Sequence, residues 1–222
     1  PQQTMIEVRG LKCSHSEKRC LKWLDSDTSP EANGGMGPLR CAEFEYPTKC
    51  LSKERKELHF WIDKFEYPNL EGSLPEVGAT WYEAKAKCES QGKRLCKDYE
   101  WEFACEGPEV NPYAYGYKRD ENICNIDKPW IDYTKYSKSR WNEIYQAVPS
   151  SSESQCKSWA GVINMNGNVD QWVYDVSEKP CKCGGGGGYW GPVRTRCSPI
   201  TTIHNETFSF YQLGFRCCKD AK

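Results

Sequence analysis

Cysteine is the residue type in this sequence with the greatest chemical potential: 14 of the 222 residues are cysteines. Their even number, without repeated C-x₂-C zinc pairs, predicts a disulfide framework formed in an oxidising compartment. Cys181 and Cys183 stand apart, because adjacent C-x-C thiols can chelate a soft metal, whereas a disulfide between them would close a strained ring. In an oxidising compartment we expect each instead to pair elsewhere. The available partners are Cys124, Cys156, Cys96 and the N-terminal cysteines.

Histidine offers little metal chemistry in this chain. The three histidines are His15, His59 and His204, and no H-x₃-H spacing places two of them on one helical face. A three-histidine iron site is therefore not expected. The glycine run at residues 184–188 could approach a phosphate, but that function requires a helix directly after it. The following residues, Tyr-Trp-Gly-Pro, do not begin one, so we expect a backbone turn.

Composition excludes two further classes. With 30 Lys and Arg against 31 Asp and Glu, the net charge of −1 gives no basic footprint for a nucleic-acid partner. No apolar run approaches the ~18 residues of a membrane span, so no transmembrane segment is expected. The sequence starts at Pro1 without a basic and apolar leader, as it would after removal of a signal peptide. We expect a secreted, periplasmic or cell-surface protein.

Two regions of the sequence differ in cysteine content and in the periodicity of their apolar residues. Residues 1–57 carry four cysteines around a turn-rich stretch and few periodic apolar residues, which predicts an N-terminal extension ordered by crosslinks and by docking. Residues 58–222 form the main domain. There, apolar alternation predicts a strand at 59–67, and helix signals appear at 80–90, with Thr80 as N-cap, and at 97–105. Regular structure is expected to be sparse up to residue 158, with short strands at 169–174 and 213–217. The fold class is α+β, loop-rich and rich in disulfides.

Several short motifs occur in a fixed order between Leu58 and Lys219. They are Phe-Trp-Ile-Asp-Lys-Phe-Glu at 60–66, Gly-Lys-Arg-Leu at 92–95, Glu-Trp-Glu at 100–102, Met-Asn-Gly-Asn-Val at 165–169, Trp-Val at 172–173 and Gly-Phe-Arg at 214–216. In this order the motifs resemble the formylglycine-generating enzyme (sulfatase-modifying factor) family, whose fold is a variant of the C-type lectin fold. The resemblance does not cover residues 1–57.

The resemblance implies two long-range disulfides and the loss of one metal. Cys88 would pair with Cys217 or Cys218, and Cys105 with Cys197. Family members bind copper through two cysteines that follow a Gly-Gly-Ser motif and oxidise a substrate cysteine with O₂. The matching stretch, 187–197, holds non-ligand residues at both positions. Neither copper nor iron is therefore expected.

Calcium is the metal that the resemblance implies. The family's first site maps to Asn164, Gly167, Val169 and Gln171, where glutamine replaces the family's glutamate and neighbouring Asp170 could compensate for the lost charge. Oxygen donors from a tight loop suit Ca²⁺. The alternative is a loop held by hydrogen bonds alone. A second site would begin at Asn125 and Ile126, with Asp127 or Asp132 completing it.

The family's substrate groove maps to the last third of the chain, where aromatic and arginine side chains of the kind that dominate recognition surfaces are interleaved. The groove residues expected are Tyr189, Trp190, Arg194, Arg196, His204, Asn205 and Glu206. A groove without metal ligands favours a non-catalytic recognition module that binds a protein, peptide or glycan. The alternative is a copper or non-haem iron oxidoreductase with rewired ligands, involving Cys181 and Cys183 or His204. Asn205-Glu-Thr207 is also an N-glycosylation acceptor sequence.

Overall fold

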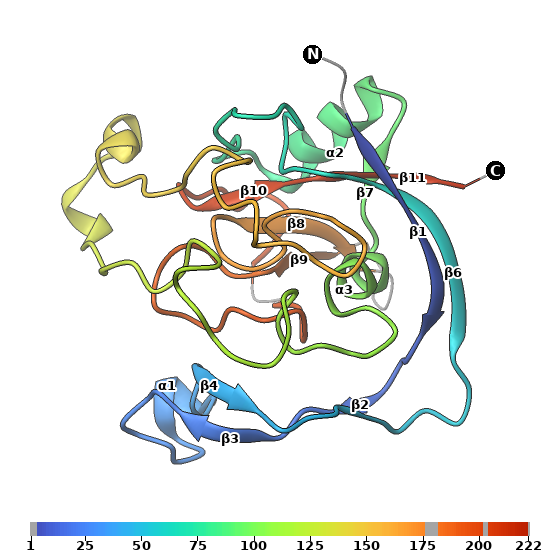
Figure 1. The fold of residues 1–222 in the computed structure, drawn as a ribbon. Coiled ribbons are helices and arrows are strands. Elements are labelled where there is room, and N and C mark those ends of the chain that lie inside the picture. Colours follow the sequence, from blue (N-terminus) through green and yellow to red (C-terminus); the bar gives the residue numbers. More distant parts are fainter. Residues whose placement is uncertain (1–3, 176–181, 202–203, 222) are drawn as a thin grey trace.

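The computed structural model describes residues 4–175, 182–201 and 204–221. Its largest sheet has four antiparallel strands. Its strands, in spatial order, are β1 (Met5–Lys12), β6 (Lys56–Asp63), β11 (Cys217–Asp220) and β7 (Arg94–Leu95). Figure 1 shows β1 and β6 running together along one side of the molecule. Along β6 the side chains at 58, 60 and 62 are buried and His59 is exposed, the alternation of a half-buried strand.

The strand predicted at 59–67 ends earlier, at Asp63. The backbone N–H of Phe65 donates to the side-chain Oδ1 of Asn69, 3.0 Å away, rather than to a neighbouring strand. A side-chain acceptor of this kind competes with the sheet ladder and turns the chain.

A second sheet has the order β10-β8-β9. The strands are β8 (Asp170–Asp175), β9 (Lys182–Gly186) and β10 (Leu213–Phe215), with β8 parallel to β10 and antiparallel to β9. Trp172 and Phe215 are register partners and both are buried. Because only Arg216 separates β10 from β11, the C-terminal segment joins the two sheets.

Two helices fall within one residue of their predicted positions: α2 (Trp81–Ser90) and α3 (Asp98–Glu106). Helix α2 begins with a capping box, in which Glu83 N–H donates to Thr80 Oγ1 at 3.2 Å and Thr80 N–H donates to Glu83 Oε2 at 2.7 Å. Between residues 107 and 158, all of which are described, the regular elements are the 3₁₀ helices η1 (Tyr133–Lys135) and η2 (Lys138–Glu143). The α+β, loop-rich expectation is confirmed.

Six disulfides connect these elements. They are Cys13–Cys50, Cys20–Cys41, Cys88–Cys217, Cys96–Cys218, Cys105–Cys197 and Cys124–Cys156. The third and fifth are pairings that the family resemblance implies. Cys217 and Cys218, neighbours in β11, bond to Cys88 of α2 and to Cys96, and so link both segments to the four-stranded sheet. Closing loops this long reduces the entropy of the unfolded chain by an amount equivalent to ~4 to 5 kcal/mol each.

Cys181 and the side chain of Cys183 lie outside the part of the chain that the structure describes. Their expected partners, Cys96, Cys124, Cys156 and the N-terminal cysteines, are all bonded to one another or to Cys218. The prediction that Cys181 and Cys183 each pair with one of these is therefore wrong.

The first strand docks residues 5–12 onto the main domain as expected, but it does so as a regular strand, where few periodic apolar residues were expected. All of β1 pairs with β6, from Met5 opposite Asp63 to Lys12 opposite Lys56, and Val8 is fully buried. Apolar residues alternate with charged ones over 6–9, which is enough for a half-buried strand. A boundary at residue 57 therefore falls within a strand pair.

Residues 13–55 leave the sheet and form what we call the N-terminal arm (Figure 1). It contains the ribbons β2 (Ser16–Glu17) with β5 (Lys49–Cys50) and β3 (Cys20–Trp23) with β4 (Cys41–Phe44), and the single turn α1 (Ala32–Gly35). The ring of Phe44 packs edge-on against that of Tyr113, with centroids 5.6 Å apart. In the described parts of the chain no helix has the length and apolarity to cross a bilayer.

Candidate functional site

A pocket of about 600 Å³ opens between the segment 187–201 and the ends of β8 and β10, and we call it the C-terminal pocket. This volume suits a small organic ligand or the side chains of a peptide. Its aromatic wall includes Tyr133, Phe208 and Phe210. Met36 and Leu39 of the N-terminal arm also line it, so the arm forms part of the pocket.

The polar part of the pocket consists mainly of Asp170, Arg194 and Arg196. Burial raises the pKa of Asp170 to about 7, although the charge of Arg194 and the N–H of Gly188 oppose the rise. Burial lowers the pKa of Arg194, against the attraction of Asp170. Burial and then repulsion by Arg194 lower the pKa of Arg196 to about 10. Three ionisable groups thus share a poorly solvated space, a feature common at functional sites.

Four of the predicted groove residues line this pocket: Tyr189, Arg194, Arg196 and His204. Trp190 does not, since it is 1% exposed and packs in the core, where its ring meets that of Tyr145 edge-on. Asn205 is exposed, and its Oδ1 accepts from the Thr207 hydroxyl at 2.8 Å. Glu206 meets helix α2 through its backbone carbonyl, which accepts from Trp81 N–H at 3.1 Å. Neither residue belongs to the pocket lining.

Sequence reasoning overlooked Asp170 and the two arm residues as parts of the pocket. From the sequence, Asp170 is expected only as a compensating charge for calcium. No sequence signal connects Met36 or Leu39 with the last third of the chain, because their contact with the pocket arises from tertiary folding.

The loop 164–171 lies beside the pocket and is held by a buried hydrogen-bond network. Glu66, completely buried, accepts from Asn168 Nδ2 at 2.9 Å and from Asn164 Nδ2 at 3.3 Å. Burial raises the pKa of this carboxyl, while the charge of Arg216 opposes the rise. Gly167 N–H donates to the carbonyl of Gly187 at 3.1 Å. Since Gly187 lines the pocket, the loop positions part of its floor.

Of the four residues mapped for the first calcium site, Gln171 has its side chain engaged by other groups. Gln171 Oε1 already accepts from Trp101 Nε1 at 2.9 Å and from the cationic Arg216 Nε at 2.6 Å, which uses both lone pairs. Its Nε2 donates to the carbonyl of Asn164 at 3.0 Å. Asp170 faces the pocket instead of supplying a compensating charge. The one favourable sign is the buried Asn164 Oδ1, which has no hydrogen-bond partner in the described structure. Calcium stays a prediction that these hydrogen bonds do not favour.

The second expected calcium site has few oxygen atoms left to act as metal ligands. Asn125 Nδ2 donates to Gln146 O and Asn168 Oδ1, both at 3.0 Å, although its own Oδ1 is buried without a partner among the described residues. Ile126 is buried in the core. Both carboxylates considered as further ligands have other partners: Asp127 forms a bidentate pair with Arg119, at 2.7 and 2.9 Å, and Asp132 caps η1.

In the described part of the chain, the ligands for a soft metal are not gathered in one place. Within the described residues, no group of three or more His, Cys, Asp or Glu side chains could hold a metal ion. The histidines occupy separate places: His15 lines a second cavity, His59 contacts Glu7 at 2.7 Å on the outer strands, and His204 lines the C-terminal pocket. In the stretch that matches the family's copper segment, Cys197 is bonded to Cys105.

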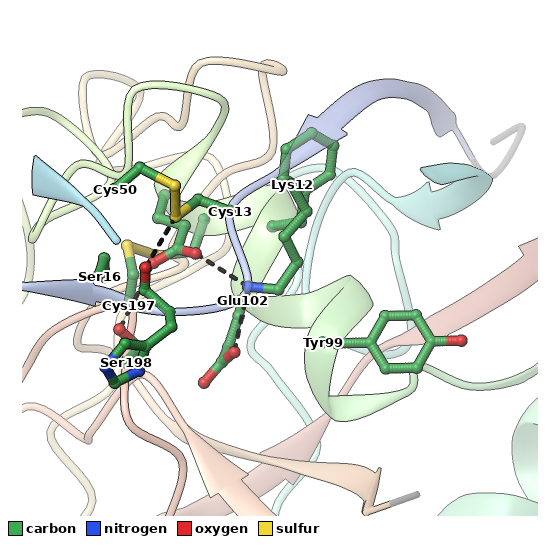
Figure 2. Close-up of polar contacts among 12 residues, drawn as sticks. Lys12, Cys13, Ser16, Cys50, Tyr99, Glu102, Cys197 and Ser198 are labelled. Atoms are coloured by element: carbon green, nitrogen blue, oxygen red, sulfur yellow. Dashed lines mark hydrogen bonds and ion pairs between the residues drawn. A yellow bond between two sulfur atoms is a disulfide. The ribbon is translucent and has the colours of Figure 1, made fainter. Parts of the chain in front are cut away.

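The second cavity, of about 380 Å³, lies between the N-terminal arm and α3. Lys12 donates to Glu106 at 2.9 Å and to Glu102 at 3.3 Å, and Figure 2 shows it beside Glu102 and the Cys13–Cys50 disulfide. Lys18 donates to Glu106 at 2.8 Å and to Ser198 at 2.6 Å. Burial disfavours the charged lysine, but the two glutamates raise the Lys12 pKa overall. These groups satisfy one another and fasten the arm to the helix.

The fold and the pocket together define a disulfide-stabilised domain of the formylglycine-generating-enzyme type. Residues 52–221 match the sulfatase-modifying factor enzyme 1-like domain. The chain belongs to this family.

Two curated relatives share this domain. Over 158 residues the chain is 27% identical to a protein named inactive C-alpha-formylglycine-generating enzyme 2 from Bos taurus, covering 67% of this chain and 51% of the relative. Over 162 residues it is 24% identical to the uncharacterized protein YfmG of Bacillus subtilis (strain 168), covering 72% of this chain and 30% of the relative. The chain therefore spans about half or less of each relative's length.

Solved structures show the same fold along almost the whole chain. CarF superposes with a TM-score of 0.58 at 13% identity, covering 100% of this chain and 99% of that one. PvdO from Pseudomonas aeruginosa superposes with a TM-score of 0.55 at 13% identity, covering 98% and 94%. At such low identity, these neighbours show the fold and do not assign an activity.

Proposed function

We propose that this protein is a non-catalytic recognition module that binds a protein, peptide or glycan in the C-terminal pocket. The observation that carries the proposal is a pocket of about 600 Å³ beside the stretch 187–197. This stretch matches the family's copper-binding segment, and its cysteine, Cys197, forms a disulfide with Cys105. A disulfide sulfur is not the thiolate that Cu(I) requires. The relative named as inactive supports the same conclusion.

The pocket has the chemistry of a recognition surface. Aromatic side chains supply most of the contact area, and arginines supply directional hydrogen bonds. Six disulfides support secretion, display at the cell surface or export to the periplasm, because such bonds persist in oxidising compartments. Hydrogen bonds within the loop 164–171 support the pocket, and a structural calcium ion at Asn164 would add to that support without changing the recognition function.

A binding array tests the recognition function. Oxidised protein would be applied to peptide and glycan arrays together with Phe208→Ala, which removes one pocket wall, and Tyr82→Ala, a control whose side chain is 57% exposed outside the pocket. We expect specific signals that Phe208→Ala loses and Tyr82→Ala keeps. Signals that are the same in all three proteins would contradict a role for the pocket.

An oxidase assay tests the alternative. Metal analysis, thiol titration and O₂ consumption with a cysteine-containing peptide would be measured on the same preparation. We expect neither bound copper or iron nor O₂-dependent turnover. Turnover accompanied by bound copper or iron would establish the oxidoreductase and overturn the recognition proposal.

A further inference from the structure

Arg194 and Arg196 are part-buried cations that have no carboxylate of the described residues within ion-pair distance, although the charge of Asp170 attracts Arg194. Among the described residues Arg194 donates to the hydroxyl of Thr201, and neither arginine forms an ion pair. The Nε of Arg196 is buried and has no hydrogen-bond partner in that part of the structure. A buried charge and a buried donor both cost free energy unless a partner satisfies them.

Other part-buried arginines of this chain do have such partners. Arg119 forms a bidentate pair with Asp127, and Arg94 pairs with Glu100 at 2.7 Å. Arg216 is fully buried and also forms no ion pair among the described residues, but its guanidinium donates to Gln171 Oε1 at 2.6 Å and to the carbonyl of Ile163 at 2.8 Å. In the same part of the structure, the two pocket arginines have neither a carboxylate in contact nor a comparable set of acceptors. A planar guanidinium matches the geometry of a carboxylate or a phosphate.

The charge balance of the pocket favours an anion. Its lining contains a single acidic side chain, Asp170, against the two arginines. The arginines are close enough for Arg194 to lower the pKa of Arg196. Because burial also holds the pKa of Asp170 near 7, this carboxyl offsets the positive charge only partly at neutral pH.

The rest of the pocket lining is mostly apolar and favours a ligand that carries an apolar group beside its anion. Tyr133, Phe208 and Phe210 offer aromatic faces, and Met36 and Leu39 of the arm add aliphatic contacts. These walls exclude a bare inorganic ion as the best occupant, since it would leave apolar surface exposed to water. An aromatic or aliphatic group attached to the anion would cover that surface.

We propose that the C-terminal pocket selects organic anions, whose carboxylate or phosphate binds Arg194 and Arg196 while an apolar body contacts the aromatic wall. This inference rests on the proposed recognition function and specifies its ligand class. The anion can belong to a free small molecule or to the end of a peptide. Both share the same chemistry.

Calorimetric titration with matched probes tests the proposal. Phenyl phosphate and phenylacetate carry the two anions on an aromatic body, a peptide ending in Phe carries a carboxylate on a chain, benzylamine carries the opposite charge, and inorganic phosphate lacks the body. We expect at least one aromatic anion to bind at millimolar concentrations or below, more tightly than benzylamine and inorganic phosphate. The ratio between free acid and peptide distinguishes the two sources.

Variants locate the binding. Arg194→Gln and Arg196→Gln should each weaken the aromatic anion about tenfold or more, the loss of a charge-assisted hydrogen bond. Arg9→Gln is the control, because this arginine is 67% exposed in an ion pair on the outer strands. Circular dichroism and the melting temperature would confirm that each variant folds. If a variant does not fold, competition by benzylamine and the salt dependence of binding still measure the preference for anions.

Two results would overturn the inference. One is tighter binding of benzylamine than of every anion, and the other is no binding of any aromatic anion. If Phe208-dependent binding of neutral or cationic ligands were found on the arrays, recognition would stand while the anion preference would fail. Oxygen turnover with a bound metal would instead remove the recognition function itself.

Discussion

Gly167 occupies a position where the structure leaves no room for a side chain. Its φ is +72°, and a Cβ there would lie 2.4 Å from both the backbone oxygen of Asn125 and Cγ2 of Ile126. Left-handed backbone costs a non-glycine residue ~1 to 2 kcal/mol. Overpacking against a fixed backbone adds ~1 to 3 kcal/mol. Gly167→Ala should therefore reduce the free energy of unfolding by about 4 kcal/mol.

Gly92 provides a matched control. Its φ is +67°, but no atom lies within 4 Å of the position that a Cβ would take. Gly92→Ala should therefore cost only the backbone strain, ~1 to 2 kcal/mol. The difference between the two variants isolates the close approach of the loop to Asn125 and Ile126.

Thermal and urea unfolding of the oxidised protein would measure both variants. For a domain of this size, 1 kcal/mol corresponds to roughly 2 to 4 °C, so we expect melting temperatures about 12 °C lower for Gly167→Ala and about 5 °C lower for Gly92→Ala. Gly167→Ala should also weaken pocket binding, because its N–H holds the carbonyl of Gly187. Equal losses in the two variants would refute the packing argument.

Three further perturbations test the ion pairs, the buried acid and the metal. Lys12→Met leaves two part-buried glutamates without this partner and should lower the free energy of unfolding in urea by ~3 kcal/mol, against less than ~1 kcal/mol for the exposed Arg9→Met. Similar losses in the two variants would contradict a stabilising role for the ion pairs of Lys12. An acid whose pKa rises to about 7 on folding holds its proton more tightly when folded, so stability should fall between about pH 4 and pH 7, and Asp170→Asn should remove that decline in pH-dependent melting. Chelation should leave the melting temperature unchanged, because hydrogen bonds already occupy Gln171; a fall restored by calcium would show that a metal supports the loop.

The local elements were predictable because their signals are local. Thr80 and Glu83 form the capping box that their spacing predicts, and apolar alternation indicated a strand at 59–67, of which 59–63 lies in β6. The pairing of β1 with β6 was not predictable, because strand register depends on contacts distant in sequence. Trp190 shows a related limit: an aromatic residue near arginines fits either a groove or a core, and only packing decides.

The candidate site was predictable only where family resemblance and composition coincided. Tyr189, Arg194, Arg196 and His204 follow from that combination, and all four line the pocket. The role of Gln171 did not follow, since a glutamine at a ligand position says nothing about the donors around it. Here Trp101 and Arg216 both donate to the side-chain oxygen of Gln171, so this residue stabilises the loop through hydrogen bonds.

The pocket combines parts of different origin within one chain. The family match begins at residue 52, whereas Met36 and Leu39 lie in the arm before it. The arm is fixed by its own disulfides, by the ion pair of Lys18 with α3 and by that of Lys12, the β1 residue directly before the arm, so its contribution to the pocket is held in place. The arginines that would bind an anion belong to the family-matched part, while part of the surface that would select the ligand's body belongs to the arm. Changes in the arm could therefore alter ligand choice without disturbing the fold, and Met36→Ala should change affinity for the ligand body while the preference for anions persists.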